Sequence, residues 1–446
     1  MTYSKIAATA ICAGISLFAS LPLHAGAAAE VSSPQRNGAL PGGGTYVVHR
    51  DATVGNAVVE LWFRAPGAGY DSAAPGLSRL ALTAVAASRP APHDTSFAEA
   101  VRLAGGRLSI NAYPDIVEVG ASVPAASAAA IVRAMTRAYF RATIGADGFK
   151  SAQRDVALAA AEKHFSADRT VHDLLMTQLF TGGPAHYPPT PDSVASLGRL
   201  TLAQTQAFAQ RAFREANAVL SIAGNAGPAA VAAAWHPAGA ASGAPVSDPP
   251  FDSTPARDLG DAVAAAPIAG AGLAWLGPGI AKTRAATALD FVADYLFNAD
   301  NGVVTAAADS IDPDSVVNGQ FITLHEPGVL LVTISSQKQA GALRAETLAA
   351  VDRLRSPLDA RAFAAARKAF EYHILSAVQT PVNAADNFGW FAVEGDAAYA
   401  PGDVSGTYVR DVESLDPRFV ASVVRAYLAH PATVELTQSH SQEASQ

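Results

Sequence analysis

The feature that most constrains the fold is an internal repeat. The segment LTLAQTQAFAQRAFREANAVLSI, which starts at Leu200, can be laid without a gap over LDPRFVASVVRAYLAHPATVELT, which starts at Leu415. Each segment reads as a leucine, a helix-capping Thr or Asp, a helix with bulky apolar residues at matching offsets, and a short strand. This repetition indicates an internal duplication with two similar halves.

The order of elements before each repeat supports the duplication. In both halves a strand is followed by a helix, a pair of alternating strands and two more helices. In the first half these are the strands Thr45–Arg50 and Ala57–Ala65, the helix Ala74–Ser88, the helix SFAEAVRLAGG, the strand pair RLSINAY and IVEVGASVP, and the helices Pro124–Tyr139 and Phe149–Phe165. In the second half they are the strand AGLAWLG, the helix Ala281–Phe297, the strand pair SVVNGQFITLH and GVLLVTISS, and the helices Ala340–Leu354 and Leu358–Val378. The sequence therefore predicts an α+β fold.

A segment without periodicity separates the halves. HPAGAASGAPVSDPPFDSTP is rich in Pro, Gly, Ser and Ala, a composition typical of linkers. We therefore predict an N-terminal α+β domain over residues 40–235, a linker over residues 236–256 and a C-terminal α+β domain over residues 257–440.

The N-terminus has the pattern of an export signal. Lys5 supplies a short positive region, IAATAICAGISLFASLPL is an apolar run, and Ala25–Ala27 offer a small-residue cleavage site. We predict a signal peptide over residues 1–27 and a periplasmic or secreted protein; a retained membrane anchor is the alternative. The one cysteine, Cys12, lies in this segment, so the mature protein has no disulfide or cysteine-ligated metal.

Charge and hydropathy exclude other classes of partner. The net charge is -8, with no long run of one sign, which argues against nucleic acid and against an anionic membrane surface. After the signal peptide no uncharged apolar run is long enough to span a bilayer.

The first half contains three local patterns in sequence: VVELWFRAPGAGYDSAAPGLSRL, AVRLAGGRLSINAYPDIVEVGASVP and the segment from LFTGGPAHY to SIAGN. Together they resemble the insulinase/pitrilysin family of metallopeptidases, the inverzincins. VVELWFRAPGAGYDSAAPGLSRL is similar to the family's strand, small-residue turn and helix entry. AVRLAGGRLSINAYPDIVEVGASVP is similar to its helix, Gly-Gly pair and strand pair, and the segment from LFTGGPAHY to SIAGN is similar to the stretch that ends in Gly-Asn or Gly-Asp. The resemblance implies two homologous α/β-roll halves around a clam-like peptide chamber.

The catalytic signature of that family is absent. The family binds zinc through H-x-x-E-H on its first helix and through a distal Glu. With Gly76 as anchor, the resemblance places Arg79 on the first His, Leu82 on the Glu and Thr83 on the second His. The distal Glu falls near Ala159 or Ala160, and Glu162 reaches that place only with a register shift.

These residues do not support zinc hydrolysis. Arginine offers no lone pair to a metal, leucine accepts no proton, and a threonine hydroxyl is a poor zinc ligand. We expect no bound zinc or other cofactor. The family's second-half Arg falls near Asp309 and its Tyr near Val317 or Asn318, so that pair is also lost.

Other candidate chemistry is weaker. His164 and His172, near Glu162 and Asp173, meet on one face if a single helix runs through them; surface or core histidines are the alternative. Ser335 and Lys338 match S-x-x-K, but a helix-starting serine explains the pattern. Four aromatic residues are candidates for a peptide groove, with core packing favoured for the two tryptophans in strands: Trp62, Trp275, Phe388 and Trp390. Arg79 either extends its head into water or pairs with a carboxylate in the vacated metal cavity.

These observations predict an exported, non-catalytic subunit. It pairs with an active homologue that carries H-x-x-E-H and helps to form a peptide-binding chamber. The alternatives are a stand-alone peptide-binding or scaffolding module without a catalytic partner, and an unconventional hydrolase.

Overall fold

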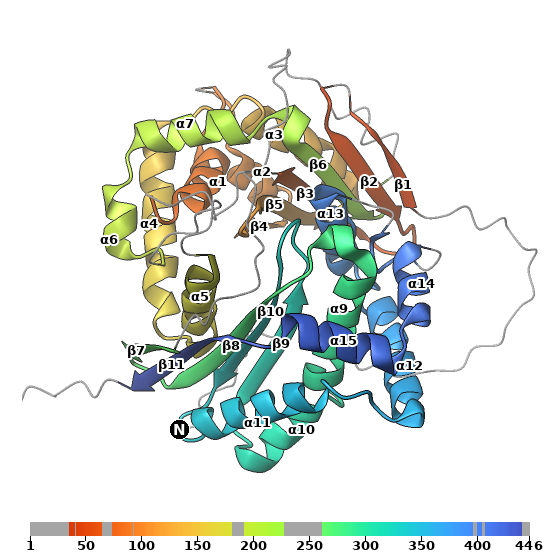
Figure 1. The fold of residues 1–446 in the computed structure, drawn as a ribbon. Coiled ribbons are helices and arrows are strands. Elements are labelled where there is room, and N and C mark those ends of the chain that lie inside the picture. Colours follow the sequence, from red (N-terminus) through yellow and green to blue (C-terminus); the bar gives the residue numbers. More distant parts are fainter. Residues whose placement is uncertain are drawn as a thin grey trace, which may run out of the picture.

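Two β-sheets organise the chain, one in each half. The computed structural model describes residues 35–40, 42–64, 74–91, 93–180, 191–226, 261–395, 399–403 and 406–438. The predicted signal peptide with Cys12 and the predicted linker lie outside these residues, so the predicted domain boundaries stay a prediction. The mixed α/β architecture in two halves confirms the predicted fold class (Figure 1).

Among the described residues, the first half contains a six-stranded sheet and seven α-helices. Its strands are β1 (Gln35–Ala39), β2 (Thr45–Arg50), β3 (Asn56–Arg64), β4 (Arg107–Ala112), β5 (Ile116–Pro124) and β6 (Ala218–Gly224). Its helices are α1 (Leu77–Ala87), α2 (Phe97–Leu103), α3 (Ala128–Tyr139), α4 (Ala146–Lys163), α5 (Ala167–Phe180), α6 (Val194–Arg199) and α7 (Leu202–Ala212).

The second half repeats these elements one for one, apart from β1. Its five-stranded sheet contains β7 (Asp261–Ala266), β8 (Gly270–Gly277), β9 (Val316–Ile322), β10 (Gly328–Ser335) and β11 (Ala432–Gln438). Its helices are α9 (Thr283–Phe297), α10 (Val303–Ile311), α11 (Ala340–Arg353), α12 (Ala360–Ala377), α13 (Pro381–Glu394), α14 (Thr407–Ser414) and α15 (Pro417–Tyr427).

Strand order establishes the same equivalence. The first sheet runs β1-β2-β6-β3-β5-β4 and the second runs β7-β11-β8-β10-β9. Strand β6 pairs parallel to β2 and antiparallel to β3, and its counterpart β11 pairs parallel to β7 and antiparallel to β8. The aligned caps also agree, because Thr201 caps α7 and Asp416 caps α15 through their side chains.

The central strands are buried on both faces. Alternate residues of β3 point to opposite sides of a sheet: Val59 and Leu61 pack in the core under the first-half helices, whereas Val58 and Trp62 pack in a core formed mainly by the second half. A strand covered on both sides reads as a continuous apolar run, which is the pattern of NAVVELWFR.

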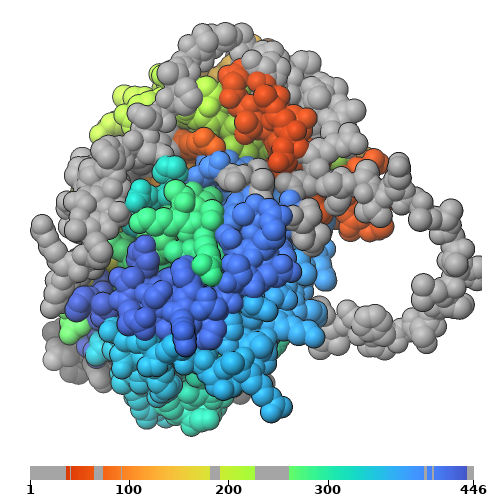
Figure 2. All heavy atoms as spheres, turned by 45° about the vertical axis from the view of Figure 1, so that its right-hand side comes forward, coloured from red at the N-terminus to blue at the C-terminus, as the bar shows by residue number. Residues whose placement is uncertain are grey.

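In each half, one face of the sheet is covered by a helix that belongs to the other half. Helix α13, of the second half, packs against β2, β3 and β6 of the first sheet, and α5, of the first half, packs against β8, β10 and β11 of the second. Figure 1 shows α13 in blue beside the first-half strands and α5 in olive beside β8. In Figure 2 the green and blue residues of the second half form the lower part of the surface. The halves therefore exchange equivalent helices.

Glycines allow the exchanged helices to approach closely. A Cβ on Gly389 of α13 would lie 2.2 Å from the Trp62 Nε1 atom, and one on Gly272 of β8 would lie 2.2 Å from Cγ1 of Val171 on α5. Ser221 of β6 fixes the first contact by donating a hydrogen bond to the carbonyl of Ala385, at 2.6 Å. Among the described helices, none combines the length and apolarity needed to cross a membrane.

Candidate functional site

Helix α1 is the segment that the family resemblance aligns with the zinc-binding helix. Gly76 at its N-cap has φ 87°, a left-handed conformation that favours glycine. A Cβ on Gly76 would also lie 2.7 Å from Cδ2 of Leu197, so α1 enters tightly against α6. The helix packs against α4 and α7, which makes it a structural part of the first half whatever its chemistry.

The former motif positions serve packing rather than catalysis. Leu82 has 0% exposure and lies in the first-half core, and its carbonyl accepts a 2.9 Å hydrogen bond from the Tyr139 hydroxyl. The Thr83 hydroxyl donates to the carbonyl of Arg79, one turn earlier, at 2.9 Å. Arg79 is half-buried, and among the described residues no carboxylate forms an ion pair with its guanidinium.

The distal position on α4 offers no ligand either. Ala160 is buried in the core and Ala159 is half-buried, whereas Glu162 is exposed near the end of the helix. The residues at the family's ligand positions therefore do not fit a zinc ion, because none of the aligned side chains is a carboxylate, imidazole or thiolate. Within the described ranges, no group of three or more His, Cys, Asp or Glu residues is arranged to hold a metal.

The second-half positions aligned with the family's Arg and Tyr hold other residue types. Asp309 is exposed on α10. Val317 and Asn318 lie on β9, the edge strand of the second sheet, and the Asn318 amide donates to Asp168 Oδ1 of α5 at 3.2 Å. These residues therefore supply no arginine or tyrosine to the first half.

The histidine cluster is interrupted by a helix end. Helix α4 ends at Lys163 and α5 begins at Ala167, so His164 and His172 are not on one continuous helix. Lys163 instead forms ion pairs with Asp173 and Asp192, each at 2.6 Å. Burial favours a raised pKa for Asp173, but the hydrogen bonds and charges of His172 and Lys163 lower it to about 2. This cluster is a structural clamp between α4 and α5.

The S-x-x-K segment is a turn that starts a helix. Its second serine, Ser336, accepts hydrogen bonds from the backbone N–H groups of Lys338 and Gln339 and donates to Asp312 Oδ2 at 2.5 Å. These bonds organise the entry to α11.

The four aromatic residues proposed for a peptide groove differ in how deeply they are buried. Trp62, Trp275 and Phe388 are at most 1% exposed and lie in the core. Trp390 is half-buried, lines a cavity, and donates its indole N–H to the carbonyl of Thr323 at 2.6 Å. Among the four, Trp390 is therefore the one available to a ligand.

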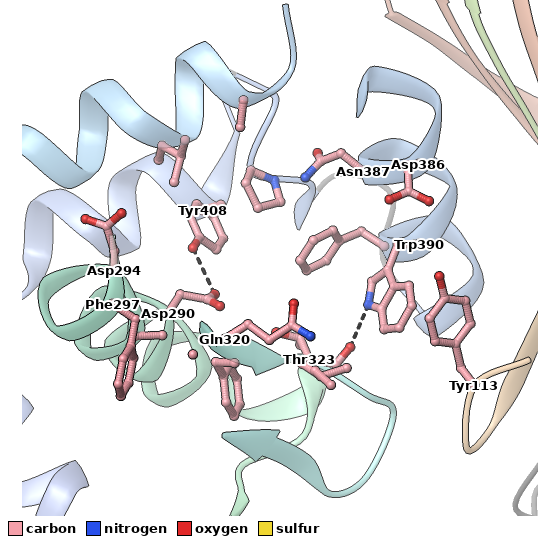
Figure 3. A pocket seen from close by; sticks show the side chains of 18 of the residues that line it. Tyr113, Asp290, Asp294, Phe297, Gln320, Thr323, Asp386, Asn387, Trp390 and Tyr408 are labelled. Atoms are coloured by element: carbon pink, nitrogen blue, oxygen red, sulfur yellow. Dashed lines mark hydrogen bonds between the residues drawn. The ribbon is translucent and has the colours of Figure 1, made fainter. Parts of the chain in front are cut away.

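That cavity, of about 530 Å³, lies between the two halves. It is lined by the turn between β4 and β5, and by α5, α9, β9, α12, α13 and α14, so the exchanged helices both contribute. Figure 3 shows Asp290 and Asp294 on one side, Asp386 and Trp390 on the other, and Gln320 between them. A hollow of this size and position is typical of a ligand-binding site.

Its carboxyl groups have different partners. Asp290 accepts a hydrogen bond from the Tyr408 hydroxyl at 2.8 Å, and burial raises its pKa to about 7 although that bond acts in the opposite direction. Asp294 lies 2.9 Å from Nδ1 of His373. Asp386 lines the hollow from α13, where its side chain is exposed to solvent.

A second carboxyl cluster lies beneath α13. Glu60 on β3 and Glu118 on β5 are 4% and 1% exposed. Glu60 accepts the indole N–H of Trp62 at 3.1 Å, and Glu118 accepts hydrogen bonds from Ser109 and Asn111 at 3.0 and 2.7 Å. Burial raises the pKa of both groups, that of Glu118 to about 7.

Neither carboxyl cluster was predicted from the sequence, although each leaves a signal there. Asp290 and Asp294 are four residues apart in the apolar helix TALDFVADYLF, so they share one face. Glu60 and Glu118 interrupt strands that are otherwise apolar. The signal was missed because the residues that complete each site come from distant parts of the chain.

Comparison with known proteins places the fold. No family model matches the sequence, and no curated protein does so. Solved structures do match: a protease from Helicobacter pylori, with a TM-score of 0.74 and 15% identity, covering 90% of this chain and 99% of the other, and a putative M16-like peptidase from Alicyclobacillus acidocaldarius, with a TM-score of 0.73 and 16% identity, covering 91% and 98%.

Two further structures match: a domain described as inactive, and a chain of a larger complex. The peptidase M16 inactive domain from Pseudomonas fluorescens has a TM-score of 0.74 and 14% identity, covering 92% of this chain and 99% of the other. A chain of complex III from Candida albicans has a TM-score of 0.68 and 13% identity, covering 90% and 95%. The chain thus has the fold of M16-like peptidases over nearly its whole length, as its resemblance to the insulinase/pitrilysin family predicted.

Proposed function

We propose that this protein is a non-catalytic, exported subunit that pairs with an active homologue and contributes to its peptide-binding chamber. The observation that carries the proposal is the state of α1. The helix retains its place in an M16-like fold, while its ligand positions hold Arg79, Leu82 and Thr83. Leu82 belongs to the core, so a carboxylate base at this position would be buried away from a substrate.

Two similar structures support the non-catalytic role by analogy. One is a peptidase M16 inactive domain, and another is a chain of complex III. A fold of this kind therefore occurs in proteins described as inactive and in chains that work within assemblies. Export is supported by the sequence pattern of residues 1–27.

Isolation from the native host tests the partnership. We expect mass spectrometry of the purified complex to identify a homologue with an intact H-x-x-E-H motif, present in a fixed ratio to this chain. Recovery of the chain alone, from gentle extraction as well as after cross-linking, would favour the stand-alone binding module instead.

Purification of the chain by itself tests the lack of activity. With added zinc and a mixture of unstructured peptides, we expect less than stoichiometric zinc and no cleavage that a chelator inhibits, because the aligned ligand positions carry no suitable donors. The active homologue, assayed in parallel, is the positive control. Stoichiometric zinc together with chelator-sensitive cleavage by the isolated chain would contradict the proposal.

A further inference from the structure

The cavity between the halves combines an apolar wall with an acidic one. Its apolar side is formed by large side chains from α5, α9, β9 and α13, among them Met176, Phe297, Phe321 and Trp390. Figure 3 shows Phe297 and the Asp290 side chain on the α9 side of the hollow, and Trp390 and Tyr113 across from them. A ligand that fits here presents an apolar surface to most of the wall.

The acidic side of the cavity has carboxyl oxygens that can accept hydrogen bonds from a ligand. Tyr408 satisfies one carboxyl oxygen of Asp290, Oδ2, while Oδ1 has no hydrogen-bond donor among the described residues. Asp290 lines the cavity beside Gln320, and Asp386 adds a second carboxyl group from α13. Asp294 is occupied by His373.

The charged residues that line the cavity favour a positively charged ligand. Among the described lining residues there is no Lys or Arg, and His172 is the single basic side chain against three aspartates. An enclosed wall of one sign concentrates ligands of the opposite sign. Aromatic faces such as that of Trp390 also attract cations.

We propose that this cavity binds a basic side chain of a peptide, with its guanidinium or ammonium group at Asp290 and its apolar stem and neighbouring residues against the aromatic wall. A cavity of about 530 Å³ is larger than a lone basic side chain needs, so it also accommodates flanking groups. A bare metal ion is a poorer fit, because the described residues contain no metal-binding group of three or more acidic, His or Cys side chains.

The inference extends the proposed function by naming the class of peptide that the chamber selects, and it rests on that function only for the origin of the peptide. The binding step itself needs this chain alone. The test therefore uses the isolated full-length protein, so a negative result here leaves the partnership intact, and absence of a partner leaves the binding result intact.

The probe is acetyl-Phe-Arg-Phe-amide, compared with the same peptide in which citrulline replaces arginine. Citrulline keeps the shape of the side chain and removes its charge. We expect the citrulline peptide to bind at least about tenfold more weakly than the arginine peptide, because charge-assisted hydrogen bonds are much stronger than neutral ones. Titration calorimetry measures both affinities. We also expect agmatine, which has the guanidinium without the peptide, to bind more weakly than the arginine peptide.

Variants identify the side chains responsible. Asp290→Asn and Asp386→Asn should each weaken binding of the arginine peptide and leave binding of the citrulline peptide nearly unchanged. Asp155→Asn makes the same change on an exposed face of α4, outside the cavity, and should leave both affinities unchanged. Thermal unfolding of each variant verifies that it is folded.

Three results would overturn the proposal. The first is equal affinity for the arginine and citrulline peptides, which needs no variant to interpret. The second is unchanged affinity in a folded Asp290→Asn protein. The third is agmatine binding as tightly as the peptide, which would assign the cavity to small amines.

Discussion

The folded protein disfavours the ionised form of the Glu118 side chain. It lies on β5, where Ser109 and Asn111 of β4 donate hydrogen bonds to it, and among the described residues no cation pairs with it. Removing a carboxylate from water without a positive partner disfavours its ionised form. Because the folded pKa of about 7 lies above the unfolded value near 4.5, folding stabilises the protonated acid.

This raised pKa predicts a loss of stability with rising pH. The contribution of Glu118 is fully present below pH 4.5 and is lost as the pH rises to about 7. One pKa unit corresponds to about 1.4 kcal/mol, so the loss is on the order of 3 kcal/mol. Glu118→Gln should flatten the dependence between pH 5 and 8, measured by urea unfolding.

Glu162→Gln is the matched control, because Glu162 is exposed on α4. It should follow the wild-type curve. A wild-type stability that stays constant over this range, or a Glu118→Gln protein with an unchanged slope, would contradict the assignment.

Sequence patterns located individual residues better than they located sites. They placed Arg79, Leu82 and Thr83 on one helix, which the structure contains as α1. The cavity was not predictable in this way, because Asp290, Asp386 and Tyr408 are scattered and each is ordinary in its own helix. They become a site only when α9, α13 and α14 are packed together.

At the level of elements, the docking of α13 depends on the absence of a side chain. Gly389 lies against Trp62, which is fully enclosed and has no room to move. The hydrogen bond from Ser221 to Ala385 holds the helix backbone at this short separation.

Gly389→Ala should therefore destabilise the protein. Inside a helix this change normally helps, but here the methyl group meets the Trp62 indole at 2.2 Å and Ser221 at 2.9 Å. Overpacking of this kind typically costs about 1–3 kcal/mol. Chemical denaturation monitored by circular dichroism provides the measurement.

Gly341→Ala is the opposite case. Gly341 lies in α11, and a Cβ there has nothing within 4 Å. It should raise the free energy of unfolding by about 0.5 kcal/mol through helix propensity alone. If both variants shift stability in the same direction, close packing at Gly389 is not the cause.

The exchanged helices are among the elements that sequence periodicity missed. It predicted the segments corresponding to α1, α2, α3, α4, α7, α9, α11, α12 and α15, together with the paired strands. It missed the short helices α6, α10 and α14 and the strands β1 and β7. Helices α5 and α13 were not predicted, although PVNAADNFGWFAVE has a Thr380 cap and a proline in its first turn. Each of these two helices packs against the sheet of the other half, and the periodicity of a single segment contains no information about such a distant contact.

For the whole molecule, helix exchange makes each half incomplete. Without α13 the first sheet exposes Val58, Trp62 and Val219, and without α5 the second exposes Leu331 and Val434. Each half thus depends on the other to bury a face of its sheet.

Cleavage within residues 236–256 tests this dependence. A protease site inserted there and then cut should leave two fragments that elute together in gel filtration and unfold in one transition. Either half expressed alone should aggregate or expose its apolar sheet face to a hydrophobic dye. Two fragments that separate and remain folded would show that the exchanged helices contribute little.

The exchange also fixes when the protein can finish folding as it is made. The strands of the first sheet are complete at Gly224, but their second cover, α13, is complete only at Glu394. At about 5–20 residues per second, the intervening synthesis takes roughly 10 to 30 s, during which an apolar sheet face has no cover from its own chain. We expect the nascent chain to be prone to aggregation through this face during that interval, unless another protein covers it.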